Sequence, residues 1–201
     1  GFHMNGRRAE EGRSFLSRKG GGTLAGEKLF PETITLRSDP FNRLYPGSRW
    51  SFGGVPSEAV TWIEKGVVRN LWYDRYWAAK AGKQPTPFPS DLVLEGGGSN
   101  LPALIASVER GLLVTRFWYL RTVNPQTAQV TGLTRDGLFL IENGKVTSPV
   151  VNFRFNESPV RLLQNTVAMG QPVRTRGGEV GMIAPPLVAR DFPFTSISDA
   201  V

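Results

Sequence analysis

The chain has 201 residues, which is enough for one domain or for two small ones. Hydrophobic residues make up 40% of it and charged residues 20%, a composition typical of a globular protein with a core. The absence of cysteine excludes disulfides, thiolate metal sites and a cysteine nucleophile. A reducing cytoplasm is compatible with this composition, and the 23 glycines and 15 prolines favour turns and short strands over long helices.

The chain is basic, with 24 Lys and Arg residues against 17 Asp and Glu and a net charge of +7. Such a balance can attract nucleic acid or acidic partners. The basic residues are spread along the chain in short pairs, however, so the pattern favours other partners over nucleic acid. No stretch approaches the roughly 20 apolar residues of a membrane span, and we expect no membrane partner.

The first four residues, Gly1–Met4, are typical of a cloning remnant ahead of a start methionine. They include the only histidine of the chain, His3, which we therefore expect to be artificial. Without it, the chain has no imidazole for general base catalysis or for metal binding.

Short elements joined by turns are predicted for the first third of the chain. Residues 5–19 can hold a short helix that is weakened by glycines. Thr33–Ser38 alternates β-branched or apolar residues with polar ones and predicts a strand. Ala59–Glu64 and Val67–Leu71 flank Lys65-Gly66, which predicts a hairpin.

Two helices with end signals are predicted next. Asp74–Ala81 forms a short helix that Gly82 ends, and Leu101–Glu109 forms another, with Asn100 as its N-cap. Residues 82–100 between them are rich in Pro, Gly and Ser, which predicts an exposed loop.

The middle of the chain has the clearest strand pattern. Leu112–Tyr119 is strongly apolar and aromatic, which predicts a central strand. Val130–Thr134 and Leu138–Glu142 are two further strands. Asn143-Gly144 supplies the positive φ values of a type I′ turn, after which Val146–Phe155 returns, with Pro149 marking an edge or a bulge.

The remainder holds one helix and short strands. Ser158-Pro159 is an N-cap followed by Pro at the first helical position, and it predicts an amphipathic helix that ends at Gly170. Val180–Ile183 and Leu187–Arg190 predict strands. The whole pattern indicates an α+β fold of mostly antiparallel β structure, barrel-like or a mixed sheet, with three or four short helices.

No catalytic constellation can be built from these residues. Gly20–Gly22 lacks the preceding strand and the Gly-Lys-Ser/Thr ending of a phosphate loop, and there is no Gly-x-Ser-x-Gly elbow. Asp136, Glu142 and Glu157 could together ligate a metal, but carboxylates in turns and hairpins are more often solvated. We therefore predict no catalytic, cofactor-binding or metal-ligating residue in this chain.

Aromatic residues gather in two places, where they form either core or the wall of a peptide or ligand groove. Core packing is the favoured interpretation. Alternation along a strand places Phe117 and Tyr119 on one face and Trp118 on the other. Asn152–Asn156 could mimic an aromatic RNA-binding strand but lacks the Gly-rich context of such motifs. The two groups are Trp72, Tyr73, Tyr76 and Trp77, and Phe117, Trp118 and Tyr119.

The segment Thr131–Val146, followed by Pro149-Val150 and Asn152–Phe155, resembles the TldD/PmbA family, also called modulators of DNA gyrase, a predicted class of metallopeptidases. Three further stretches agree in the same order. The resemblance extends from about Gly12 to Val201, so we expect residues 5–201 to form one TldD/PmbA-like C-terminal domain. The three stretches are Gly12–Ser17 with Gly26-Glu27, Ile63–Val68, and Asp191–Ser196 with Ser198-Asp199.

The resemblance implies a zinc peptidase. Active members hold zinc on a His-Glu-x-x-x-His helix, and a glutamate-activated water attacks a peptide bond. They act on small or unfolded peptides as two-subunit complexes, in which one subunit holds the metal and the other lacks the ligands. The present chain has neither that helix nor a cysteine, and Gly12–Ser17 resembles the segment just after the helix.

From this resemblance we expect the C-terminal domain of a cytoplasmic metallopeptidase, with no cofactor of its own and inactive alone. Its expected partners are its own N-terminal half, a family paralogue in a homo- or heterodimer, and peptide substrates. The alternatives are a non-catalytic interaction or partner subunit of such a peptidase and, last, a basic nucleic-acid-binding module.

Overall fold

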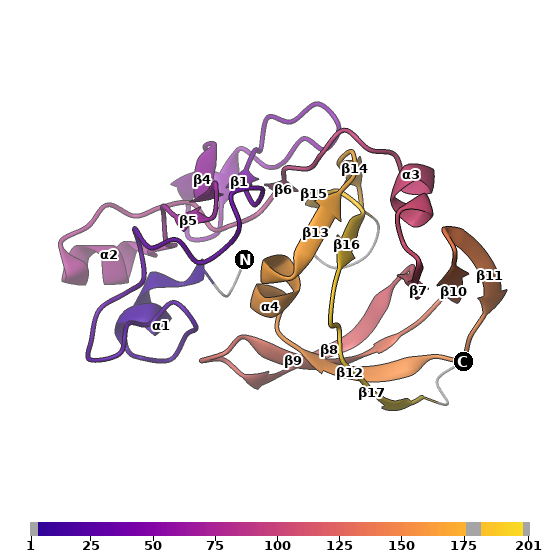
Figure 1. Ribbon diagram of the computed structural model, residues 1–201. Helices are drawn as coiled ribbons and strands as arrows, with labels where there is room; N and C mark the ends of the chain where they lie inside the picture. The colour runs from indigo at the N-terminus through magenta and orange to yellow at the C-terminus, as the bar shows by residue number, and fades with distance from the viewer. Residues whose placement is uncertain (1–3, 176–181, 199–201) are drawn as a thin grey trace. The chain divides into compact units, whose positions relative to one another are not determined.

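A computed structural model describes residues 4–175 and 182–198 (Figure 1). The chain forms two compact units, each made of two separate stretches of sequence. The first unit consists of residues 1–97 and 171–185, and the second of residues 98–170 and 186–201. In sequence order the chain therefore alternates between the units: first, second, first, and second again.

The first unit is built on a six-stranded sheet in which β1 occupies an inner position. The pairs are antiparallel except for β15 with β6, which is parallel. A separate two-stranded hairpin joins β2 (Trp50–Ser51) and β3 (Val55–Pro56). In sheet order the six strands are β14 (Val173–Arg174), β15 (Met182–Ala184), β6 (Leu92–Leu94), β1 (Leu36–Ser38), β4 (Val60–Glu64) and β5 (Val67–Val68).

The core of the first unit surrounds Trp62, which is fully buried together with Leu16, Ile34 and Val68. An indole N–H removed from water needs an acceptor. Trp62 Nε1 donates to Ser38 Oγ at 2.9 Å, and this hydroxyl donates in turn to the Ser90 carbonyl at 2.6 Å. The hydrogen bonds join β4, β1 and the segment before β6.

Both helices of the first unit begin at side-chain caps. Asn5 accepts from the Arg8 amide ahead of α1 (Gly6–Glu10), and Asp74 accepts from the Trp77 amide ahead of α2 (Arg75–Ala81). The αL residue Gly82 ends α2, as predicted. The helix predicted within residues 5–19 is confirmed only as the five residues of α1.

The prediction of a loop over residues 82–100 is wrong in its second half. Residues 92–94 form β6, in which Val93 and Leu94 are buried. β6 pairs with β1 on one side and with β15 on the other. Its partners are distant in sequence, so local composition carries no signal for it.

In its described part, the second unit contains three sheets and two helices, α3 (Leu101–Ala106) and α4 (Pro159–Gln164). The largest sheet has the order β17 (Phe194–Ile197), β12 (Phe153–Glu157), β9 (Gln129–Thr134) and β8 (Phe117–Asn124). A second has the order β11 (Lys145–Pro149), β10 (Leu138–Glu142) and β7 (Arg110–Val114). The third pairs β13 (Thr166–Met169) with β16 (Leu187–Ala189).

Two long predicted strands of this unit are divided in the structure. The expected central strand 112–119 becomes β7 and β8, which are edge strands of different sheets. The expected strand 146–155 becomes β11 and β12, again in different sheets, with Pro149 at the end of β11. Each apolar run changes sheets midway, which its hydrophobic pattern does not reveal.

The turns and caps of the second unit follow the sequence more closely. Asn143 and Gly144 have φ values of 51° and 75° in the β10–β11 hairpin, as a type I′ turn requires. Asn100 and Ser158 cap α3 and α4 as predicted. α4 ends at Gln164, however, because the residues expected to continue it to Gly170 form β13.

The predicted fold class is confirmed as α+β with mostly antiparallel sheets and four helices within the described residues. No sheet closes into a barrel in that part of the chain. None of the helices described is long and apolar enough to span a membrane. Two predictions fall partly or wholly outside the described residues: the first two positions of the strand expected at 180–183, and the histidine at position 3. Met4 is described and buried, and its carbonyl accepts from the Trp72 amide at 2.7 Å.

The β4–β5 hairpin depends on Gly66. Its φ is +80°, and a Cβ there would lie 2.0 Å from the Phe30 carbonyl oxygen. Gly66→Ala therefore combines left-handed strain with a backbone clash, and we expect it to lower the free energy of unfolding by about 3 kcal/mol or more.

Gly82→Ala is the matched control for this hairpin. Gly82 has a similar φ of +65°, but a Cβ added there would have no other atom within 4 Å. We expect a loss of only about 1 kcal/mol from strain alone. Urea unfolding of both variants measures the difference, and equal losses would contradict the clash.

Candidate functional site

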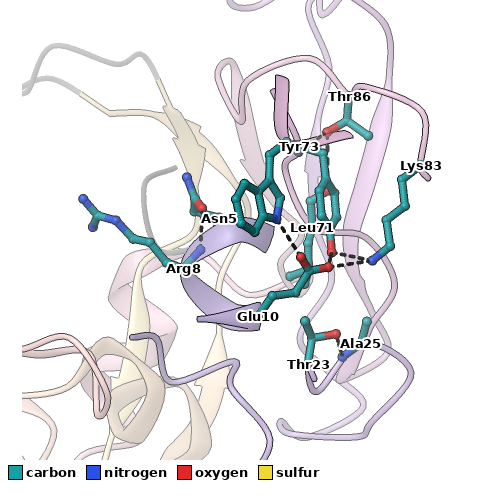
Figure 2. Close-up of polar contacts among 10 residues, drawn as sticks. Asn5, Arg8, Glu10, Thr23, Ala25, Leu71, Tyr73, Lys83 and Thr86 are labelled. Atoms are coloured by element: carbon teal, nitrogen blue, oxygen red, sulfur yellow. Dashed lines mark hydrogen bonds and ion pairs between the residues drawn. The ribbon is translucent and has the colours of Figure 1, made fainter. Parts of the chain in front are cut away.

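Three side chains of the first unit donate to the carboxylate of Glu10, and Figure 2 labels two of them, Tyr73 and Lys83. The Tyr73 hydroxyl donates to Glu10 Oε1 at 2.8 Å, and Trp77 Nε1 donates to Oε2 at 2.6 Å. Lys83 Nζ donates to Glu10 Oε1 at 3.1 Å and to the Tyr73 hydroxyl oxygen at 2.5 Å. We call Glu10, Tyr73, Trp77 and Lys83 the Glu10 latch.

The position of Glu10 follows from how α1 lies against residues 72 and 73. The Gly6 amide donates to the Trp72 carbonyl at 2.9 Å, and a Cβ on Gly6 would lie 2.3 Å from the Tyr73 ring. Only glycine allows this approach. Glu10 follows Gly6 by four residues and so lies on the same face of the helix, toward Tyr73.

The donors come from one continuous segment that contains α2: Tyr73 precedes the helix, Trp77 lies in it and Lys83 follows it. Tyr73 and Trp77 are four residues apart, and the αL turn at Gly82 reverses the chain so that the Lys83 amide donates to the Ala78 carbonyl. Lys83 Nζ then lies 4.3 Å from the Tyr73 ring centroid. Thr86 fixes the other end of the segment, since its hydroxyl accepts from the Tyr73 amide at 3.0 Å.

The protonation states of the latch favour binding over proton transfer. Partial burial raises the pKa of Glu10, but hydrogen bonds from Trp77, Tyr73 and Lys83 outweigh it, so the pKa lies below its ordinary value. Burial raises the pKa of Tyr73. For Lys83, burial lowers the pKa, but the Tyr73 and Glu10 hydrogen bonds reverse this and raise it. At neutral pH the cluster therefore holds a carboxylate, a phenol and an ammonium ion, none of which titrates near neutrality.

The three carboxylates considered as metal ligands have separate partners. Asp136 pairs with Arg116 and lies 3.5 Å from Arg135 Nε, and Glu142 accepts from the Thr147 hydroxyl. Glu157 is buried, accepts from the Ser158 amide at 2.7 Å and lies 3.8 Å from Arg161 Nε. The structure does not bring them together.

Across the residues that the structure describes, no three His, Cys, Asp or Glu side chains are grouped as a metal site would require. The latch offers one carboxylate already occupied by three donors. The donors in this part of the chain therefore do not fit a zinc ion.

The aromatic residues are divided between core and surface. Trp72 and Tyr73 are buried, and Trp72 packs edge-on against Phe88 at 5.0 Å, whereas Tyr76 is exposed. The alternation predicted for residues 117–119 is wrong at Tyr119, whose φ is +55° at a shift in strand register. Its ring contacts that of Trp118 at 5.4 Å.

The strand that resembled an RNA-binding motif is part of a phenylalanine cluster. Phe155 is buried, and its ring lies 4.8 Å from Phe117 and 5.3 Å from Phe192. Phe153 contacts Phe194 at 5.3 Å. Phe155 is therefore a core residue and Phe153 packs half-buried against Phe194, so this strand presents no free row of rings on which bases could stack.

The latch has no local signal in the sequence. Glu10 is separated from its donors by 63 to 73 residues. The aromatic residues form a visible group, but nothing nearby in the sequence connects them to a carboxylate in α1. The one usable hint is the four-residue spacing of Gly6 and Glu10 on a helix face.

Comparison with known proteins identifies the family. The sequence matches the family described as PmbA/TldA metallopeptidase C-terminal domain over residues 1–196. The chain belongs to this family. None of the curated proteins has a matching sequence.

Solved structures agree with the family assignment. A candidate modulator of DNA gyrase from Bacteroides thetaiotaomicron is 30% identical with a TM-score of 0.77, and TldE from Thermococcus kodakarensis is 26% identical with a TM-score of 0.77. They are matched over 98% and 92% of this chain. A Thermotoga maritima protein, 19% identical over 93% of this chain with a TM-score of 0.78, shares the fold. This chain covers only 43% of the first two proteins and 44% of the third.

The stability of the PmbA/TldA-type domain should depend on pH through Glu10. Because the pKa of the folded state is lowered, ionised Glu10 stabilises the fold above the ordinary pKa of about 4.3, and this is lost as pH falls through the folded value. At pH 7 we expect Glu10→Ala to lower the free energy of unfolding by about 2 kcal/mol, and by less at pH 3.

Glu11→Ala is the control for this measurement. Glu11 is the adjacent carboxylate and pairs with Arg7 and Arg13 at the surface. Exposed ion pairs contribute little to stability, so Glu11→Ala should lower the free energy of unfolding only slightly at both pH values. Urea unfolding at the two pH values decides, and a Glu10→Ala cost that does not fall at pH 3 would contradict the assignment.

Proposed function

We propose that this domain serves a cytoplasmic metallopeptidase that cuts small or unfolded peptides, and that the metal is bound by a different part of the protein. The observation that carries the proposal is the family match over residues 1–196. The neighbours are more than twice as long as the matched region, which leaves room in such proteins for a metal-binding segment. The domain then contributes surface for peptide and for a second subunit.

Strand β8 is the best candidate for that surface. It is an edge strand of its sheet, and it exposes Phe117, Tyr119, Leu120 and Val123. An edge strand has unpaired backbone groups that an extended peptide or a partner strand can pair with. Apolar side chains beside this edge would add affinity without demanding a particular peptide sequence.

The alternative is the same domain in a non-catalytic partner subunit. In that case the domain would use the same surfaces, but the intact protein would lack metal ligands. The two proposals differ in what precedes Met4 in the whole protein, and a His-Glu-x-x-x-His sequence there favours the catalytic subunit.

Zinc content and peptide cleavage test the proposal directly. We expect the 201-residue chain alone to bind no stoichiometric zinc and to cut no peptide, because the donors among its described residues do not fit the metal. We expect the whole protein, purified with its family partner, to contain zinc and to cut an unfolded fluorogenic peptide, with activity lost on chelation.

Each result has a defined meaning. Stoichiometric zinc in the chain alone would overturn the placement of the metal. A whole complex without zinc and without cleavage would favour the partner subunit. Binding of DNA that weakens steeply with salt would instead indicate the nucleic-acid module.

A further inference from the structure

We propose that the Glu10 latch is a positioning device that fixes the direction of α1 and thereby of the chain that leads into it. In this view Glu10 is a positioning residue and makes no contact with substrate. The consequence for peptide cleavage rests on the proposed function, whereas the latch itself can be tested without it.

Helix α1 cannot hold its direction alone. It has five residues, and isolated helices of that length are unstable in water because nucleation is costly. Contacts with the rest of the first unit must therefore set its direction. It is attached near its beginning, where the Trp72 amide donates to the Met4 carbonyl and the Gly6 amide donates to the Trp72 carbonyl.

The latch provides the second attachment, at the last residue of the helix. One point of attachment leaves a short helix free to rotate about it, and two points define an axis. Glu10 receives three donors from the segment 73–83, and two of them are held in place by α2 and its αL cap. Figure 2 shows the Tyr73 and Lys83 side chains converging on the Glu10 carboxylate.

The charges around the latch make Glu10 difficult to replace. Arg7 lies 5.0 Å and Lys80 4.6 Å from the Trp77 ring centroid, and Lys83 binds Glu10 itself. Arg7 keeps its ion pair with Glu11, but removal of the Glu10 charge leaves Lys83 without that carboxylate partner. The three hydrogen bonds that join α1 to residues 73–83 are lost with it, so the attachment of α1 should loosen.

The latch is better suited to positioning than to catalysis. The pKa of Tyr73 and that of Lys83 are raised, so neither is a base at neutral pH, and the Glu10 oxygens are already occupied by donors. Tyr73 is also buried. A fully paired cluster of this kind stabilises one arrangement of its elements.

Hydrogen exchange on this chain tests the latch. In Glu10→Ala we expect the Ala9 and Glu11 amides, which bond to the Asn5 and Arg7 carbonyls, to exchange about tenfold faster, while the amides of β9 and β12 are unchanged. The matched control Glu11→Ala should leave α1 protected. Tyr73→Phe removes the hydroxyl donor and keeps the ring, and Trp77→Phe removes the indole donor and keeps a smaller aromatic ring, so both give intermediate rates if the alanine variant fails to fold. Equal protection of α1 in all four variants would overturn the latch.

Positioning is tested in the whole protein with its partner. We expect Glu10→Ala to speed exchange in the residues that immediately precede α1, and to lower kcat for a fluorogenic peptide by about tenfold while KM and zinc content stay unchanged. Glu11→Ala should change none of these. If Glu10→Ala speeds exchange in α1 but not in the residues that precede α1, the proposal that the latch positions the preceding chain is overturned. If the unsubstituted protein cuts no peptide, the proposed function fails, and the two exchange measurements still decide the latch.

Discussion

The pairing of β1 on both sides is the constraint on which the first unit depends. Its three residues pair with β4, which is near in sequence, and with β6, which is farther along the chain. Ser38 at the end of β1 accepts the indole N–H of the buried Trp62 and donates to the Ser90 carbonyl ahead of β6. Through these pairings the β4–β5 hairpin at Gly66 and β6 are both placed by this short strand.

The Glu10 latch shows how a weak element gains a fixed place. α1 contributes little stability of its own. Gly6 lets the helix approach the Tyr73 ring, and the Glu10 carboxylate accepts a hydrogen bond from the Tyr73 hydroxyl. A carboxylate that accepts from an indole, a phenol and an ammonium group is satisfied without a metal and without a substrate. Its role in this unit is therefore structural.

The sequence predicted the features that depend on neighbouring residues. The caps at Asn100 and Ser158 and the turns at Lys65-Gly66 and Asn143-Gly144 were correct because their chemistry is contained in a few adjacent positions. The features that failed depend on distant partners. β6 is a strand because it pairs with β1 and β15. Residues 112–119 belong to two sheets because their first part pairs with β10 and their last part with β9. Glu10 was missed for the same reason.

The parallel pairing of β15 with β6 has a consequence for synthesis. The first unit needs residues 171–185, which leave the ribosome only after most of the second unit has been made. Until then β6 has β1 on one side and an unpaired edge on the other, with Val93 and Leu94 among its residues. A nascent chain in this state carries an open apolar strand throughout the translation of residues 98–170, which is the condition under which chaperones and wrongly paired strands compete for an edge.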